Sequence, residues 1–377
     1  MELNGTVNFS LQEAYGVLLE SMGSDRNLDS HTEMVLVTVY GALMAVGLLA
    51  NLAVGLVVAG RPRLRTARNL YVANLAVSDM TLCAVCMPFT LIAIVRRRWS
   101  LGVALCKLVP LAQGTNIMVS VGTITVIAVD RYSTIVRGGH HGSEGGTGGD
   151  RRRVAISIAL VWALSALATL PVVFYQVVEP LTFSHVVLYE TCIERWPSQT
   201  LRVSYTASVL LVQAVIPALV VGVVHARIAS YLHQHAQTQK DSRRAKRELQ
   251  RNRKTTMLLS GVAVLFAVSW LPLGVFTLTA DLLFPPGADP NPASARQLYL
   301  TLAACHALAM SSAVSNPVVY GWLNTNIRQE LLQLLPASCS SLAQPTAGDD
   351  PTTRHTSLAL LHKPQTMVTN ATTTAQL

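Results

Sequence analysis

The chain has 377 residues, of which 51% are hydrophobic and only 13% are charged. Soluble domains carry about 25% charged residues, so this composition indicates lipid as the solvent for much of the chain. The net charge of +9 does not indicate nucleic-acid binding, because the basic residues fall in short clusters between hydrophobic runs. The six cysteines do not form a paired metal-ligand pattern, and no metal centre is predicted.

The first 33 residues are polar and acidic. They lack the basic region and apolar core of a cleavable signal peptide. Two glycosylation sequons begin at Asn4 and Asn8. Two sequons ahead of the first apolar segment predict a glycosylated extracellular tail over residues 1–33.

Seven hydrophobic segments follow, each near or above the ~20 residues that a helix needs to cross hydrocarbon. They lie at residues 34–60, 69–95, 103–136, 153–175, 203–230, 254–283 and 296–321. Because no water inside a bilayer can satisfy an open backbone, these segments must be helical. The sequence therefore predicts an all-α membrane protein, with a seven-transmembrane helix bundle over residues 34–321. The prolines inside the segments are expected to kink the helices rather than end them. These are Pro88, Pro110, Pro171, Pro217, Pro272 and Pro317.

Basic residues set the expected orientation. They concentrate in the connections at 60–68, 137–153 and 227–254, which the positive-inside rule places in the cytoplasm. The opposite side carries most of the acidic residues, with one exception, the three consecutive arginines at 96–98. We therefore expect a multi-pass protein of the plasma membrane with an extracellular N-terminus.

The region after the seventh segment divides into two parts. Residues 322–335 are expected to form a membrane-surface helix, with its amphipathic pattern over 324–335. Its apolar residues, expected to face lipid, are Ile327, Leu331, Leu334 and Leu335. Residues 336–377 are rich in Ser, Thr and Ala and are expected to be a disordered cytoplasmic tail. Cys339 is a palmitoylation candidate, with a plain unmodified cysteine as the alternative.

Four polar side chains stand at matching depths on four different segments: Asn51, Asp79, Ser120 and Asn316. Asp79 is the only acid deep inside a segment. A buried carboxylate needs a counter-charge or a proton. The four residues therefore predict a polar network that holds a sodium ion or a proton, with helix-to-helix hydrogen bonding alone as the alternative.

Motifs on all seven segments resemble one family, the rhodopsin-like (class A) G-protein-coupled receptors. In chain order they are Asn51, Leu75-Ala76-x-x-Asp79, Asp130-Arg131-Tyr132, Trp162, Pro217, Trp270-x-Pro272 and Asn316-Pro317-x-x-Tyr320. The stretches LYVANLAVSD, MPFTLI, CKLVPLAQG, FAVSWLPL and NPVVYGWLN further resemble the neuropeptide Y receptors and the invertebrate neuropeptide F receptors. The resemblance covers about residues 34–335 and is absent from the loops and tails.

The resemblance implies a disulfide and a cytoplasmic switch. It pairs Cys106 with Cys192, which an oxidising exterior permits. The switch residues that it implies are Asp130, Arg131, Tyr132, His225 and Tyr320. In that reading, Arg131 pairs with Asp130 at rest and reaches a G protein when released. The alternative is that Arg131 only anchors the helix end.

Two residues near the switch depart from the family pattern. His225 stands where the family usually has a tyrosine that supports the open state, and Asn252 replaces an acid that locks the arginine in many relatives. Both departures leave the efficiency of coupling open.

The resemblance also implies an outer ligand cavity. The residues assigned to it are Thr90, Gln113, Glu194, Trp270, Thr277, Asp281 and His306. Gln113 replaces the aspartate of amine receptors, and the seventh segment lacks the lysine of opsins. Neutral donors and acceptors suit a carboxamide, while Asp281 and Glu194 would meet arginines of an amidated peptide. Solvated rim charges are the alternative for both acids.

The sequence thus predicts a G-protein-coupled receptor for an amidated neuropeptide of the neuropeptide Y/F type. Coupling to inhibitory G proteins, with lowered cAMP, is what the subfamily implies, and arrestin is a further expected partner. A receptor for another peptide class or for purines is the alternative. A transporter would need charged or broken helices at the midplane, which the sequence lacks. No nucleophile, base and orienting group converge in the sequence, so it predicts no enzyme and no cofactor beyond the sodium ion.

Overall fold

The computed structural model describes residues 26–136, 147–183, 186–238, 243–284, 292–323 and 325–334. The described residues up to Leu331 form one compact unit, and of the second unit only Leu332 to Leu334 are described. The predictions for Asn4, Asn8 and Cys339 lie outside these residues.

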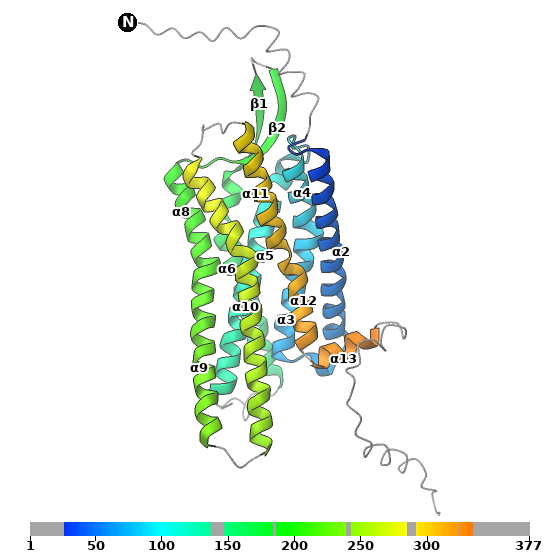
Figure 1. Cartoon of the computed structure of the whole chain (residues 1–377), viewed down its shortest axis with the longest axis vertical. Helices are drawn as coiled ribbons and strands as arrows, with labels where there is room; N and C mark the ends of the chain where they lie inside the picture. The colour runs from blue at the N-terminus through cyan, green and yellow to red at the C-terminus, as the bar shows by residue number, and fades with distance from the viewer. Residues whose placement is uncertain are drawn as a thin grey trace, which may run out of the picture. The chain divides into compact units, whose positions relative to one another are not determined.

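Seven helical segments in the described residues are long and apolar enough to cross a membrane, as the sequence predicts. Four of them consist of more than one helical element (Figure 1). In chain order the elements of the bundle are α2 (Ser30–Gly60), α3 (Ala67–Thr81), η2 (Leu82–Cys86), α4 (Met87–Val95), α5 (Gly102–Val136), α6 (Thr147–Thr169), α7 (Pro171–Tyr175), α8 (Gln199–Leu210), η3 (Leu211–Val215), α9 (Ile216–Thr238), α10 (Arg243–Leu283), α11 (Pro292–Met310) and α12 (Ser312–Leu323). A single turn, η1 (Pro62–Leu64), links α2 to α3.

Helix α5 lies at the centre of the bundle. It contacts α3, α6, α9 and α10, and 61% of its most apolar stretch is buried inside the protein. In the α8–α9 segment, Gln199–Gln234, only 6% of the most apolar stretch is buried inside the protein. Apolar side chains on that segment, such as Leu219 and Val223, face outward, as expected for a helix whose solvent is lipid.

Two of the prolines follow a widened helical turn. The π-helical segments η2 and η3 end two residues before Pro88 and Pro217, respectively. Proline lacks an N–H and clashes with the carbonyl four residues earlier, and a π turn is one way for a helix to absorb such a disruption. Pro110, Pro272 and Pro317 instead lie inside α-helices, as predicted.

Helices α9 and α10 extend well beyond the predicted apolar segments. The prediction ended the fifth segment at residue 230 and began the sixth at 254, whereas α9 reaches Thr238 and α10 begins at Arg243. The hydrophobic pattern marks only the part of a helix that meets lipid. Polar helical turns beyond the membrane do not contribute to this pattern and are therefore not predicted by it.

A β-hairpin lies beyond one end of the helices, which we call the hairpin end (Figure 1). Strand β1 (Gln176–Phe183) pairs antiparallel with β2 (Val186–Glu194). This hairpin was not predicted from the sequence, although its β-branched residues favour strands. The opposite end, where α5 carries Asp130-Arg131-Tyr132, is called the Arg131 end.

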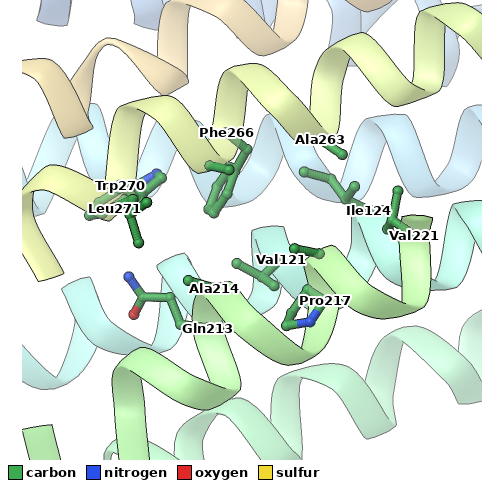
Figure 2. A pocket seen from close by; sticks show the side chains of 12 residues that line it. Val121, Ile124, Gln213, Ala214, Pro217, Val221, Ala263, Phe266, Trp270 and Leu271 are labelled. Carbon is green, nitrogen blue, oxygen red and sulfur yellow. The ribbon is translucent and has the colours of Figure 1, made fainter. Parts of the chain in front are cut away.

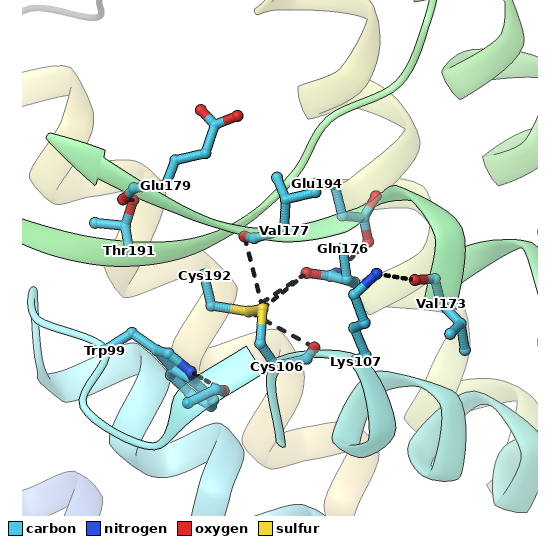
Figure 3. Close-up of a disulfide and its surroundings, with 11 residues drawn as sticks. Trp99, Cys106, Lys107, Val173, Gln176, Val177, Glu179, Thr191, Cys192 and Glu194 are labelled. Atoms are coloured by element: carbon cyan, nitrogen blue, oxygen red, sulfur yellow. Dashed lines mark hydrogen bonds between the residues drawn. A yellow bond between two sulfur atoms is a disulfide. The ribbon is translucent and has the colours of Figure 1, made fainter. Parts of the chain in front are cut away.

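The predicted disulfide between Cys106 and Cys192 is confirmed, and it joins the start of α5 to β2 (Figure 3). The two Cα atoms are 5.7 Å apart, and the cysteines are separated by 86 residues. In the chain-entropy model, closing a loop of this length stabilises the fold by about 4.6 kcal/mol. Trp99 adds a second connection, since its backbone N–H donates to the Glu190 carbonyl of β2 at 2.7 Å. The hairpin is therefore fixed over the ends of the helices.

Helix α13 (Thr325–Leu334) follows α12 and agrees with the predicted amphipathic helix. The prediction that Ile327 faces lipid is wrong, because Ile327 is fully buried in the protein core. The cause is an ion-pair cluster one turn further along. Glu330 accepts hydrogen bonds from Arg61 at 3.0 Å and from Arg63, and these bonds hold this face of α13 against the α2–α3 connection.

Candidate functional site

The hairpin end of the bundle contains a cavity of about 480 Å³. Helices α4, α5, α8 and α10 and the strand β2 all contribute to its wall. Four of the predicted ligand residues line it: Thr90, Gln113, Glu194 and Thr277. Its volume lies in the range of sites that bind drug-sized molecules.

A chain of neutral hydrogen bonds runs from the cavity wall into the bundle. Thr90 Oγ1 donates to Gln113 Oε1 at 2.9 Å, and Gln113 Nε2 lies 3.0 Å from His306 Nε2. His306 Nδ1 lies 2.6 Å from Tyr40 Oη. If Gln113 donates to Nε2, a neutral imidazole carries its proton on Nδ1 and donates it to Tyr40. His306 therefore supports Gln113 from behind, and it does not itself line the cavity.

This network contains no ionised group. It holds the Gln113 carboxamide in one orientation at the cavity wall, and a second donor of its NH₂ group is left for a molecule in the cavity. Tyr40, which is fully buried, was missed by the sequence analysis because it lies alone in an apolar segment. A buried tyrosine hydroxyl normally has a partner, and that rule is the signal that could have found it.

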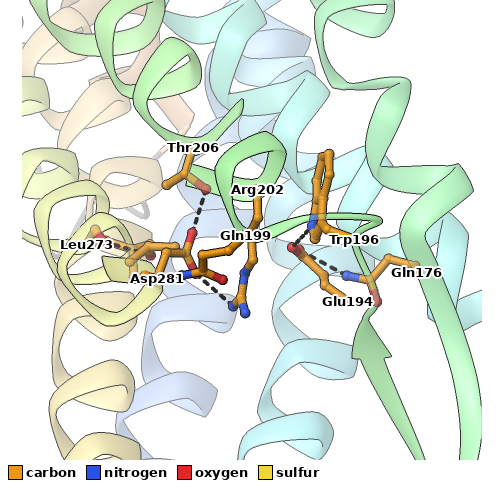
Figure 4. Close-up of polar contacts among 9 residues, drawn as sticks. Gln176, Glu194, Trp196, Gln199, Arg202, Thr206, Leu273 and Asp281 are labelled. Carbon is orange, nitrogen blue, oxygen red and sulfur yellow. Dashed lines mark hydrogen bonds and ion pairs between the residues drawn. The ribbon is translucent and has the colours of Figure 1, made fainter. Parts of the chain in front are cut away.

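Glu194 is held at the cavity wall by two neutral donors. Gln176 Nε2 donates to one carboxylate oxygen at 3.1 Å, and Trp196 Nε1 donates to the other at 2.9 Å (Figure 4). Among the described residues no cation pairs with Glu194. The carboxylate is thus positioned but not neutralised, which leaves it able to bind a cationic group.

Asp281 lies behind the wall instead of lining the cavity. Its carboxylate is almost fully buried. It pairs with Arg202 of α8 at 2.7 Å and accepts a hydrogen bond from Thr206 at 2.7 Å (Figure 4). Gln199 donates to the Asp281 backbone carbonyl. The acid predicted to meet a ligand arginine is therefore already occupied by an arginine of the chain itself. Arg202 was missed because the predicted segment began at residue 203.

Trp270 lies deeper in the bundle than the cavity. Its indole N–H donates to Ser312 Oγ at 3.1 Å, and its ring stacks on Phe266 with centroids 5.9 Å apart. The two rings border a small apolar void of about 40 Å³, together with Pro217 and Val121 (Figure 2). The void leaves room for these rings to shift relative to α5 and α9.

The predicted polar network consists of three separate contacts. Asn316 Nδ2 donates to Asp79 Oδ2 at 3.0 Å, whereas Asp79 Oδ1 is buried without a hydrogen-bond partner. Ser120 instead contacts Ser78, whose hydroxyl also donates to Asn116. Asn51 bonds to the backbone of Gly47 and Ala313, and so ties α2 to α12.

This donor set fits a small hard cation. Oxygen ligands from a carboxylate, amides and hydroxyls suit such an ion. The orphaned Asp79 Oδ1 is the kind of buried atom that one would satisfy.

At the Arg131 end, Arg131 pairs with its neighbour Asp130, with Nη2 and Oδ2 3.1 Å apart. Both side chains are partly exposed, and Arg131 Nε is buried without a partner. His225 of α9 contacts Ser260 of α10 through Nδ1 and Oγ, 2.6 Å apart. This bond ties α9 to α10.

The remaining residues of the predicted switch are Tyr132 and Tyr320. Tyr132 is half-buried near the end of α5. The backbone of Tyr320 lies in α12, and its side chain, like that of Asn252, lies outside the described part of the structure.

A bundle of seven membrane-length helices, with a ligand-sized cavity at one end and an Asp-Arg pair at the other, defines a multi-pass membrane protein of the receptor type. The sequence matches the family "7 transmembrane receptor (rhodopsin family)" over residues 50–320. The chain belongs to this family of G-protein-coupled receptors, which are not enzymes.

Two relatives narrow the comparison. The chain is 38% identical over 336 residues to the neuropeptide F receptor of Drosophila melanogaster, a match that covers 85% of this chain and 66% of that receptor. It is 34% identical over 306 residues to the human neuropeptide Y receptor type 2, which covers 80% of this chain and 76% of the relative.

Proposed function

We propose that this receptor binds an amidated peptide of the neuropeptide F/Y type at its hairpin end and signals through an inhibitory G protein. The observation that carries the ligand class is the neutral Thr90–Gln113–His306 network on the wall of the 480 Å³ cavity. The printed names of the relatives support a peptide of this type.

The polarity of the cavity favours a carboxamide over a charged end group. A primary amide both donates and accepts hydrogen bonds, so it can pair with the similar carboxamide of Gln113. A free carboxylate would be desolvated there with no cation from the network to compensate it. Glu194, held by Gln176 and Trp196, would repel a carboxylate and attract an arginine of the peptide.

The test uses two peptides that differ at one group. Cells expressing the receptor receive an Arg-Ala-Arg-Phe peptide with either an amidated or a free C-terminus, and the fall in stimulated cAMP is recorded. We expect the amidated form to act at a concentration at least about tenfold lower. Equal potency, or no response to either peptide, would refute the proposed ligand class. A cAMP response that survives inactivation of inhibitory G proteins would refute only the coupling.

Orientation follows from the same proposal. The hairpin end faces the extracellular space, residues 1–33 form the extracellular tail, and residues 336–377 form a cytoplasmic tail. The disulfide at the hairpin end supports this orientation, because disulfides persist in oxidising compartments. Glycosidase mapping should find sugar on Asn4 or Asn8. Asn370 begins a further sequon, and sugar found on it would show that the proposed orientation is wrong.

The sodium ion is the last part of the proposal. Asp79 would supply the charge, Asn316 already bonds to it, and Ser120 and Asn116 are further polar groups of the right chemistry in the bundle. When bound, the ion neutralises the carboxylate and so favours the resting arrangement of α3 and α12 around it. The orphaned Asp79 Oδ1 supports this assignment.

A further inference from the structure

A second cavity, of about 490 Å³, lies at the hairpin end beside the first. Its wall contains four guanidinium groups and, among the residues described, no carboxylate. The arginines are Arg96, Arg97, Arg98 and Arg296. We call this cavity the basic vestibule. It shares three lining residues, Ala93, Trp99 and Cys192, with the 480 Å³ cavity, so one molecule can extend from one into the other.

The loop that carries three of these arginines is fixed on both sides. Before it, Asn27 donates its backbone N–H to Val95 at 2.9 Å and its side-chain amide to the Arg96 carbonyl at 3.2 Å. After it, Trp99 bonds to the Glu190 carbonyl of β2 and, through its indole N–H, to the Gly102 carbonyl at 2.9 Å. Trp99 lies beneath the hairpin near the disulfide (Figure 3). The arginines are therefore presented from an ordered backbone, which lowers the entropy cost of binding.

Within the described residues, an ion pair joins an acid to an arginine of the vestibule. Asp29 pairs with Arg296 at 2.8 Å, and Thr32 donates two hydrogen bonds to the same carboxylate. These bonds, with that of Arg296, lower the pKa of Asp29 to about 2, so it stays ionised. Among the residues described, the wall of the vestibule carries four arginines and no acid, and Asp29 pairs with one of the four. A concave surface with one sign of charge attracts opposite charge and raises association rates.

This cluster is also the one exception to the charge pattern that orients the chain. Basic residues on the side opposite the cytoplasmic loops oppose the positive-inside bias. Topology therefore gives no reason for three consecutive arginines at this place. A role in binding would explain why arginines are present at a position that opposes the positive-inside bias.

We propose that the basic vestibule binds an acidic segment of the peptide ligand, upstream of the amidated end that enters the 480 Å³ cavity. This assignment rests on the proposed function for the adjacent cavity. A site of that size accommodates only a few residues, and the shared wall at Trp99 and Cys192 lets a longer peptide continue into the vestibule. Guanidinium groups bind carboxylates through charge-assisted, often bidentate hydrogen bonds, which gives selectivity for aspartate and glutamate side chains.

The experiment uses the full-length receptor in nanodiscs of neutral phosphatidylcholine. The probes are Gly-Ser-Arg-Ala-Arg-Phe-amide peptides, extended at the N-terminus by either tetraglutamate or tetraglutamine. We expect the tetraglutamate probe to bind at least about tenfold more tightly at low ionic strength, with the difference shrinking as salt is added. A receptor with Arg97→Gln, Arg98→Gln and Arg296→Gln should lose this preference. It should still bind the tetraglutamine probe as the parent does, which shows that it is folded.

Arg195→Gln is the matched control. Arg195 is an exposed arginine at the same end, it pairs with Glu179 at 2.8 Å, and it lines neither cavity. This variant should keep the tetraglutamate preference. Equal affinity of both probes for the parent receptor, or a preference that survives in the triple variant, would overturn the vestibule assignment and leave the proposed ligand class intact.

Two further outcomes separate the alternatives. The acidic tail of the chain itself could fill the vestibule. If the parent shows no preference and one appears after Glu13→Gln, Glu20→Gln and Asp25→Asn, the tail is the occupant and the proposal is wrong. If neither probe binds, the proposed function fails. Acetyl-tetraglutamate amide then tests the vestibule alone, and binding that the triple variant abolishes would still support it, whereas no binding would refute it.

Discussion

Single polar side chains inside the bundle each have few partners, so replacing one changes a small and known set of contacts. Asp79 shows this most clearly, with one oxygen bonded to Asn316 and the other orphaned. An unsatisfied buried oxygen costs free energy, which a bound cation or a proton removes.

Asp79→Asn tests the cation. An amide keeps the hydrogen bond to Asn316 possible but removes the charge that would attract sodium. We expect sodium to lower agonist affinity in the parent and to have little effect in the variant. Radioligand competition in sodium chloride and in N-methylglucamine chloride of equal ionic strength separates the ion from general screening. An identical sodium shift in both receptors would exclude Asp79 as the ion site.

His225→Tyr tests the tie between α9 and α10. The substitution removes the bond from His225 Nδ1 to Ser260, and a phenol could reach toward α12 in an open arrangement. A net hydrogen bond contributes about 1 kcal/mol, so basal signalling should rise by up to about fivefold. Nucleotide exchange at matched surface expression measures this, and Ser260→Ala should act in the same direction. Unchanged basal exchange in both variants would show that this bond does not restrain activation.

Gln113 and Asp281 show which contacts of single side chains could be predicted from the sequence and which could not. Gln113, Thr90 and His306 were predicted as one group, and their hydrogen bonds do join them. Asp281 was assigned to the ligand because the family resemblance implied that role. Arg202 lies about 80 positions earlier, and only the packing of α8 against α10 brings the two together. Such a pairing cannot be read from the spacing of residues along the chain.

Among the contacts that hold the helices together, the Arg202–Asp281 ion pair joins α8 to α10 at the hairpin end. A ligand arginine that binds Asp281 must first displace Arg202. Arg202→Ala should therefore raise the affinity of the amidated Arg-Ala-Arg-Phe peptide by about three- to tenfold, because an uncompensated buried carboxylate is left for the ligand. Asp281→Ala should lower the affinity by about 2 kcal/mol.

A double-mutant cycle decides between ligand contact and structural tie. With peptides whose arginines are replaced one at a time by alanine, Asp281→Ala should add little further loss for one of them. If Arg202→Ala and Asp281→Ala both weaken binding of every peptide equally, the pair serves only to hold α8 against α10.

Helix α13 is attached to the bundle by Glu330. The hydrogen bond from Arg63, with Arg61 beside it, lowers the pKa of Glu330 below its usual range. The stabilisation is therefore fully present above the ordinary glutamate pKa and is lost as the pH falls through the lowered value. Glu330→Gln should loosen α13 at pH 7, measured as faster amide hydrogen exchange over residues 325–334. Gln333→Ala, at an exposed position of the same helix, is the control and should leave exchange unchanged.

The elements themselves were predicted unevenly, for physical reasons. The seven segments were found because hydrocarbon demands about 20 apolar residues, a signal that is local and strong. The π turns before Pro88 and Pro217 and the hairpin β1–β2 depend on how neighbouring elements pack or pair. The buried position of Ile327 likewise follows from Glu330 and its two arginines, which lie about 270 residues apart from it in sequence.

Across the whole molecule, the central helix α5 links the two ends of the bundle. Its first turns carry Cys106 and Gln113, and its last turns carry Asp130 and Arg131. The Trp270–Phe266 rings lie between these ends, beside the 40 Å³ void. A peptide that shifts the hairpin end can therefore act on the other end through movement of packed side chains, which rearrange between discrete states.

Arg131→Ala tests whether that end is a switch. The guanidinium now pairs with Asp130, and release of this pair would let it reach a G-protein helix. We expect the variant to lose agonist-stimulated nucleotide exchange while it keeps surface expression and most of its peptide binding. Arg227→Ala removes an exposed positive charge from α9, which also extends to the Arg131 end, and should leave exchange intact. If Arg131 were only a topological anchor, both variants would exchange nucleotide normally once correctly inserted, because either charge would contribute equally to the positive-inside bias. Loss of exchange in the first variant alone would assign the effect to the position of this guanidinium at the end of α5, since the two substitutions remove the same charge.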